Sequence, residues 1–78
     1  MEIHPAARRH GVNDRDIEHA ITHAMASDRQ DDDTTLRLGP ARNGDLLEIA
    51  FITRDDGTHL VIHAMRMRSK YQRLLSGD

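Results

Sequence analysis

Two apolar segments of strand length, joined by a hairpin signal, constrain this chain more than any other feature of its sequence. Residues 46–53 form the most hydrophobic strand, Asp55-Asp56-Gly57 is typical of a tight turn, and residues 60–65 form the returning strand. Residues 34–39 also alternate between apolar and polar side chains, as a half-exposed strand does. The pattern therefore predicts a small antiparallel sheet of three to four strands.

Two N-terminal helices are expected before this sheet. Pro5 suits the first turn of a short helix over residues 4–10, and Gly11 suits its end. Asn13 or Asp14 can then cap a second helix. Its apolar residues recur at helical spacing at Ile17, Ala20, Ile21 and Ala24. With a basic C-terminal helix after the last strand, we expect an α+β fold whose helices pack on one face of the sheet.

Period-two alternation predicts which side chains share a face of the sheet. The residues expected in the core are Leu36, Leu38, Leu47, Ile49, Phe51, Leu60, Ile62 and Ala64. Arg37, Glu48, His59 and His63 then share the other face. A guanidinium, a carboxylate and imidazoles can together bind a phosphodiester and transfer protons. The ordinary alternative is a solvated face with cross-strand ion pairs.

The C-terminal segment is strongly basic, although the formal net charge of the whole chain is −2. Between residues 66 and 73 it carries four cations and no acid, and these are Arg66, Arg68, Lys70 and Arg73. A local positive patch beside histidines favours phosphate binding and points to RNA. Tyr71 either stacks on a base or packs its ring under the arginine stems.

Length and composition limit the remaining classes. The 78 residues predict one domain over 1–78, and a chain without cysteine has neither disulfides nor thiolate metal sites. No apolar run is long enough to span a bilayer and the N-terminus lacks signal-peptide features, so we expect a cytoplasmic protein.

His19 and His23 are one helical turn apart and able to chelate an ion, but they lie opposite the apolar stripe of their helix. We predict no metal and no cofactor. The aspartates of residues 28–33 indicate a solvated turn, with a metal site or a contact to a basic partner as alternatives.

Several short motifs resemble those of a known toxin family. His10-Gly11-Val12 followed by Asp16-Ile17 resembles the "KHGVS..EA" opening of BrnT toxins, part of the RelE-like group of bacterial ribonucleases. Further motifs follow in the same order, namely Arg37-Leu38-Gly39, the 46–53 strand, Asp56-Gly57 and Ile62-His63-Ala64 before basic residues. BrnT-like chains begin with an extra strand, for which we expect no counterpart before His4, and Ala64-Met65-Arg66-Met67-Arg68 shifts the family's arginine register.

The resemblance implies a toxin of a type II toxin–antitoxin pair, which cuts RNA without metal and is silenced by a ribbon-helix-helix antitoxin. The catalytic candidates are Glu48 and His63 for proton transfer and Arg37 and Arg66 for stabilising the phosphate charge. The RNA-binding candidates are Arg9, His10, Arg68, Lys70 and Tyr71, and His10 has the alternative of capping the first helix. Two other classes stay open. One is a noncatalytic binding module that uses the sheet face or edge, and the other is a small homodimer joined through Met65 and Met67.

Overall fold

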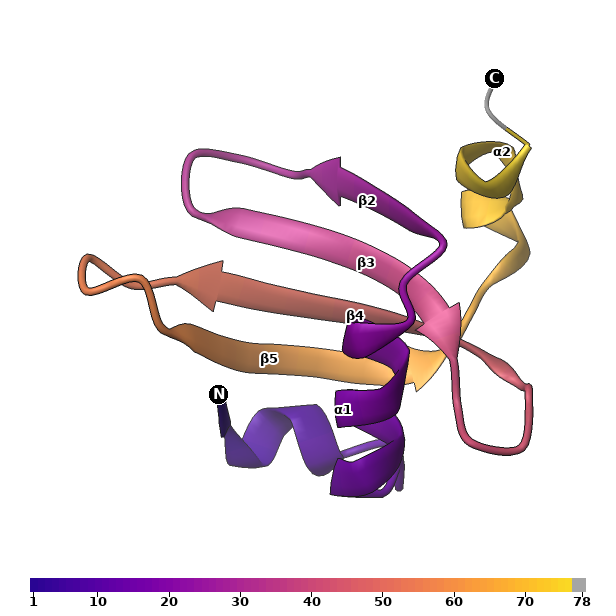
Figure 1. Ribbon diagram of the computed structural model, residues 1–78, viewed down its shortest axis with the longest axis horizontal. Helices are drawn as coiled ribbons and strands as arrows, with labels where there is room; N and C mark the ends of the chain where they lie inside the picture. Colours follow the sequence, from indigo (N-terminus) through magenta and orange to yellow (C-terminus); the bar gives the residue numbers. More distant parts are fainter. Residues whose placement is uncertain (77–78) are drawn as a thin grey trace.

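The computed structural model describes residues 1–76, and its largest feature is a five-stranded sheet (Figure 1). The strands are β1 (Glu2–Ile3), β2 (Ala26–Arg29), β3 (Thr34–Pro40), β4 (Leu46–Thr53) and β5 (His59–Arg66). They lie across the sheet in the order β1-β5-β4-β3-β2. Neighbouring strands are antiparallel except β1, which runs parallel to β5.

This mixed sheet corrects the predicted fold. Strands β3, β4 and β5 lie where alternation placed them, but the expectation of three to four antiparallel strands was wrong. β1 lies before His4, where we expected no strand, and pairs Glu2 with Leu60 and Ile3 with Val61. Two residues are too few to show a period, and β2 carries the polar sequence Ala-Ser-Asp-Arg. Both outer strands are therefore defined by hydrogen bonds to their neighbours and not by an apolar pattern.

The helical segments are shorter than the sequence suggested. The first is a 3-10 helix, η1 (Pro5–Arg8), whose start is capped by His4 Nδ1 accepting from the Ala6 N–H at 3.0 Å. The second is α1 (Asp14–Thr22), where Asn13 Oδ1 accepts from the Arg15 N–H at 2.8 Å. The expected C-terminal helix consists of the 3-10 turn η2 (Ser69–Tyr71) and one short turn, α2 (Gln72–Leu75). No helix in the described part of the chain is both long and apolar enough to cross a membrane.

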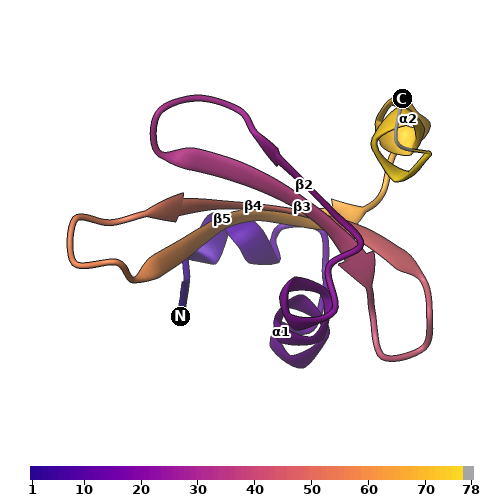
Figure 2. The same cartoon turned by 45° about the horizontal axis from the view of Figure 1, so that its top comes forward.

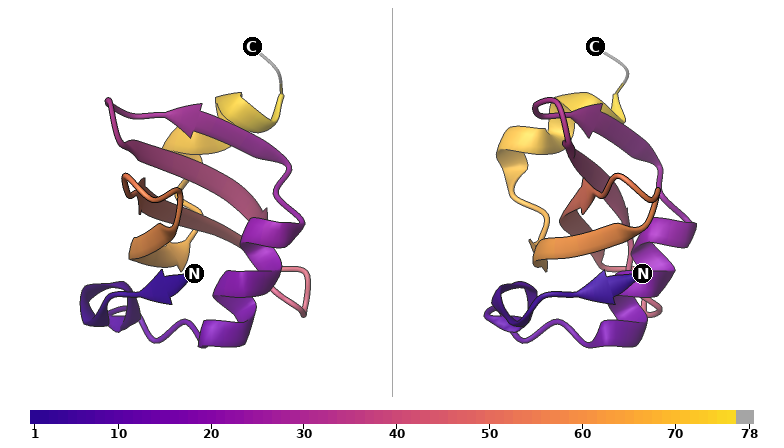
Figure 3. Two further views of the ribbon diagram at one scale, coloured as in Figure 1. Left: turned by 60° about the vertical axis from the view of Figure 1, so that its left-hand side comes forward. Right: turned by 90° about the vertical axis from the view of Figure 1, so that its left-hand side faces the viewer.

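The helices cover both faces of the sheet, so the prediction that they share one face was also wrong. Figure 2 shows α1 on one side of the sheet and α2 on the other. α1 packs against β3 and β4, and η1 packs against β5. α2 lies beside β2, at the far edge of the sheet from the N-terminus (Figure 3). We call the side that carries α1 and η1 the helix face and the other side the Glu48 face.

The main core lies between the helix face and its two helices. Its members are Ala7, Ile17, Ala20, Ala41, Leu47, Ile49, Phe51, Val61 and Ala64. α1 approaches the sheet closely at Gly39, where an added Cβ would overlap the carbonyl oxygen of Ala20. A glycine at this position therefore sets how near the helix lies to β3.

Strand register changes part of the predicted core. A shift between Ala50 and Phe51 pairs Phe51 with Val61, so Val61 is buried in the core and Ile62 is only half-buried. Leu36 and Leu38 are buried, but they pair with Ala50 and Glu48 and so lie on the opposite side from Phe51. The predicted core residues thus divide between the two faces.

Candidate active site

A fully buried carboxylate occupies the Glu48 face of β4. Glu48 is 0% exposed, while its neighbours Leu47 and Ile49 point into the core on the other side. Burying an ionised carboxylate is costly unless it is paired. Here Oε1 accepts from the backbone N–H of Arg68 at 2.9 Å, and Oε2 accepts from Arg68 Nη2 at 2.7 Å. Arg68 Nε lies 3.1 Å from Oε1, and His63 Nε2 lies 3.0 Å from Oε2.

These contacts decide the ionisation of Glu48. Burial, the largest single effect, raises the pKa of this carboxyl. The hydrogen bonds from Arg68 and His63 together outweigh burial and lower the pKa of Glu48 to about 2. Near neutral pH such a carboxylate is a weak base, because an efficient proton acceptor has a pKa close to the working pH. Glu48 was predicted to transfer protons, but its geometry is that of a group that positions its two neighbours.

His63 is the partner of Glu48 on β5. It stands opposite Ala50 in the sheet, and its side chain is 30% exposed. Because an ionised carboxylate only accepts hydrogen bonds, the Nε2 of His63 carries the hydrogen in this contact. Its Nδ1 is then left as the acceptor nitrogen of the neutral ring. Glu48 thereby selects both the tautomer and the orientation of His63.

A second histidine reaches the same place from the N-terminal part of the chain. The ring of His10 meets that of His63 edge to face, with 5.8 Å between the ring centroids. His10 is exposed and follows η1, just before Gly11 turns the backbone with a φ of 75°. The fold thus brings His10, from the His10-Gly11-Val12 motif, into contact with the His63 imidazole that Glu48 holds.

The basic residues that follow β5 complete the cluster. The side chain of Arg68 is 46% exposed, and its guanidinium carbon lies 5.7 Å from the centroid of the Tyr71 ring. The ammonium of Lys70 lies 5.0 Å from the same centroid. Arg68 was predicted only as an RNA-binding residue, and no spacing in the sequence signals that it is the main partner of Glu48. We call Glu48, His63, His10, Arg68 and Tyr71 the Glu48 cluster.

The structure does not bring the other two predicted arginines into this cluster. Arg37 pairs with Ile49 and so lies on the helix face, with its guanidinium 4.9 Å from the centroid of Phe51. Arg66 pairs with Leu47, is 77% exposed and contacts Asp45 at 3.0 Å. The prediction that Arg37 shares the face of Glu48 was therefore wrong.

Two further predicted residues, Arg9 and His59, lie outside the Glu48 cluster. Arg9 is exposed and directly precedes His10, and no acidic partner for it occurs within residues 1–76. His59 pairs with Thr53 on the helix face, and its ring centroid lies 4.4 Å from that of Phe51. Arg9 is thus a sequence neighbour of a cluster residue. The prediction that His59 shares the face of Glu48 was wrong.

The histidine pair on α1 is separate from this cluster. The rings of His19 and His23 are 4.3 Å apart between centroids, and His19 Nδ1 is 2.8 Å from the carbonyl oxygen of Pro40. The carboxylate of Asp16 is already bound by Arg42 Nε at 2.8 Å. Within the described residues, no group of three or more histidine, cysteine, aspartate or glutamate side chains is arranged to hold a metal ion.

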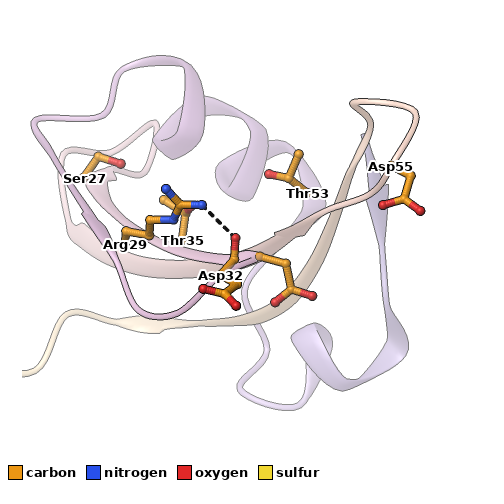
Figure 4. A pocket seen from close by; sticks show the side chains of 7 residues that line it. Ser27, Arg29, Asp32, Thr35, Thr53 and Asp55 are labelled. Carbon is orange, nitrogen blue, oxygen red and sulfur yellow. Dashed lines mark hydrogen bonds between the residues drawn. The ribbon is translucent and has the colours of Figure 1, made fainter.

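A polar pocket lies on the helix face near the tips of the two hairpins (Figure 4). Its volume is about 640 Å³, and it is lined by Ser27, Arg29, Asp32, Asp33, Thr35, Thr53 and Asp55. Arg29 Nη2 donates to the backbone carbonyl of Asp32 at 2.9 Å, so this guanidinium holds the β2–β3 loop (Figure 4). The aspartate-rich segment thus forms one wall of a pocket that is separate from the Glu48 cluster.

Comparisons with protein-family models, with curated proteins and with solved structures gave no match to this chain. A functional assignment for the Glu48 cluster accordingly starts from the chemistry of its residues.

Proposed function

We propose that this chain is a metal-independent endoribonuclease and acts as the toxin of a type II toxin–antitoxin pair. The observation that carries the ribonuclease proposal is the buried carboxylate of Glu48, which holds the His63 imidazole at 3.0 Å and the Arg68 guanidinium at 2.7 Å. The toxin role and the ribbon-helix-helix antitoxin partner rest on the sequence resemblance to BrnT toxins. A cytoplasmic location is proposed from the cysteine-free composition, which suits a reducing compartment.

Cleavage of RNA without a metal uses the ribose 2′-hydroxyl as the nucleophile. Its oxygen attacks the adjacent phosphorus, the bond to the 5′-oxygen breaks, and a 2′,3′-cyclic phosphate and a 5′-hydroxyl form. The reaction needs a base for the 2′ proton and positive charge near the phosphate. His63 Nδ1 is the base in this proposal, and Arg68 supplies the charge through the edge of its guanidinium that Glu48 does not occupy.

In this proposal Glu48 transfers no proton. It is a positioning residue that orients His63 and Arg68. Arg37 and Arg66 have no part in the reaction, because both lie on the far side of β4 from Glu48. Around the cluster, Arg9 and Lys70 attract the RNA backbone, and Tyr71 offers a ring on which a base can stack.

The test is cleavage of a labelled RNA by the purified protein in the presence of EDTA. We expect the wild type to release products ending in a 2′,3′-cyclic phosphate and His63→Ala to lower the rate at least ~100-fold, the usual worth of a proton-transfer group. His23→Ala removes an exposed imidazole from the end of α1 and serves as the matched control. A wild type that cleaves no RNA, or a His63→Ala variant as fast as His23→Ala, contradicts the proposal.

A noncatalytic binding module is the second candidate, and the engagement of Arg68 by Glu48 favours it. A buried ion pair of this kind is also found as a purely structural element. In that case the protein retains RNA or a protein partner without cleaving RNA. Growth after induced expression separates the two candidates in cells, since only a ribonuclease toxin arrests growth in a way that His63→Ala relieves.

A further inference from the structure

We infer that His10 is the second proton-transfer group of the Glu48 cluster, the general acid that protonates the 5′-oxygen as it leaves. The inference rests on the proposed ribonuclease function and adds a catalytic residue to it. It starts from the contact between the His10 and His63 rings, whose centroids are 5.8 Å apart.

The surroundings of His10 leave its ring available to a substrate. Its side chain is exposed, and within the part of the chain that the structure describes neither ring nitrogen has a hydrogen-bond partner. The only ring contact of His10 in the described residues is the one with His63. A phosphodiester bound at the His63 ring therefore lies within reach of the His10 ring as well.

The other titratable neighbours do not suit the role of the acid. Glu48 has both oxygens occupied, and its pKa of about 2 leaves it without a proton near neutrality. Arg68 and Arg9 are guanidiniums, which do not give up a proton in proteins. His63 has its Nε2 hydrogen directed at Glu48 and its Nδ1 free to accept. Tyr71 carries a phenol and Lys70 an ammonium group, and both of these chemical types are ordinarily much weaker acids than an imidazolium. His10 is the remaining imidazole, and imidazole is the side chain that both gains and loses a proton near neutral pH.

The two histidines then act on opposite sides of one phosphorus atom. His63 takes the proton of the 2′-hydroxyl as the 2′-oxygen forms its bond to phosphorus. The bond from phosphorus to the 5′-oxygen breaks with its electron pair on that oxygen, and His10 delivers its proton there. The cyclic phosphate carries the original single negative charge, and the two imidazoles exchange their protonation states, which water restores. No metal or other co-reactant enters the balance.

Substituting the leaving group tests this assignment directly. In an RNA whose scissile 5′-oxygen is replaced by sulfur, the departing thiolate needs no proton, so the acid becomes dispensable. We expect His10→Ala to slow cleavage of normal RNA at least ~100-fold, yet to cleave the 5′-thio substrate within about threefold of the wild type. His63→Ala removes the base and is expected to stay slow on both substrates. His23→Ala again controls for the loss of an exposed imidazole.

The outcomes separate the inference from the function on which it rests. If the wild type cleaves RNA and His10→Ala is as fast as the wild type, or is equally impaired on both substrates, His10 is not the general acid and the ribonuclease proposal stands. If the wild type cleaves neither substrate, the ribonuclease proposal fails and the inference falls with it. Unchanged thermal unfolding of His10→Ala, followed by circular dichroism, excludes a folding defect as the cause of a lower rate.

Discussion

Replacing Glu48 by glutamine tests whether the ionised carboxylate stabilises the fold as well as the site. Glutamine keeps the shape of the side chain but loses its charge, and its amide nitrogen donates where the carboxylate accepted. In either orientation of the amide, its nitrogen then faces a donor nitrogen of Arg68, which cannot accept a hydrogen bond, at a fully buried position. We expect Glu48→Gln to lower the free energy of unfolding near neutral pH.

The magnitude follows from the pKa of Glu48. Folding lowers this pKa from its ordinary value of 4.5 to about 2. At about 1.4 kcal/mol per pKa unit, the ionised carboxylate contributes up to about 3 kcal/mol. Because the folded-state pKa is the lower one, this contribution is complete above the unfolded value of 4.5 and is lost as the pH falls toward 2. Glutamine does not titrate, so the difference in free energy of unfolding between the wild type and Glu48→Gln becomes smaller in acid. At about pH 3 this difference is roughly 2 kcal/mol smaller than near neutral pH.

The assay is urea denaturation of both proteins at about pH 7 and about pH 3, followed by far-ultraviolet circular dichroism. Other carboxylates titrate equally in the two proteins and cancel in the difference. Asp45→Asn, which removes an exposed carboxylate from a surface ion pair, is the control and should change stability by less than about 1 kcal/mol. If the wild type and Glu48→Gln differ in free energy of unfolding by the same amount at both pH values, the reasoning is refuted. That result would show that the charge of Glu48 does not stabilise the folded state.

Two further predictions concern the frame around the site. Gly39→Ala is expected to cost more than about 2 kcal/mol in chemical denaturation, because its Cβ would overlap the Ala20 carbonyl. Gly44→Ala measures the cost of backbone strain alone, since its Cβ meets no neighbour but its φ of 94° is unfavourable for alanine. A loss in Gly39→Ala no larger than that in Gly44→Ala would contradict the close approach of α1. Arg66→Ala is expected to change stability by less than about 1 kcal/mol and to leave RNA cleavage unaltered, because its ion pair with Asp45 is exposed. A large loss of activity in that variant would restore Arg66 to the site.

How far the sequence predicts this fold differs from strand to strand. In β4 the alternation assigned both faces correctly, with Leu47 and Ile49 in the core and Glu48 on the other side. In β3 the same pattern misled, because Leu36 and Leu38 are buried on the face opposite the main core. Alternation divides the residues of a strand between two faces of the sheet. It does not say which of these faces carries the main core when other elements partly cover both.

The candidate site was predictable only in its parts. The types of residue were visible in the sequence, and His63 and Glu48 do lie on one face in contact. The role of Arg68 was not visible in the sequence, because its position depends on the path of the backbone after β5. This path directs the Arg68 N–H to Oε1 of Glu48 at 2.9 Å. Nothing in the local pattern distinguishes Arg68 from Arg66, although Arg68 is bound to a buried carboxylate and Arg66 forms an exposed ion pair with Asp45.

The amino-acid sequence by itself determined the three long strands, a capped start of the second helix at Asn13 or Asp14 and the placement of Glu48 away from the main core. These features depend on residues a few positions apart, whose spacing and side-chain chemistry act locally. Only the tertiary structure decided the two outer strands, the opposite-face position of Arg37 and the meeting of His10 with His63. Those features depend on strand register and on contacts between distant segments, and a shift of one residue in register reverses every face.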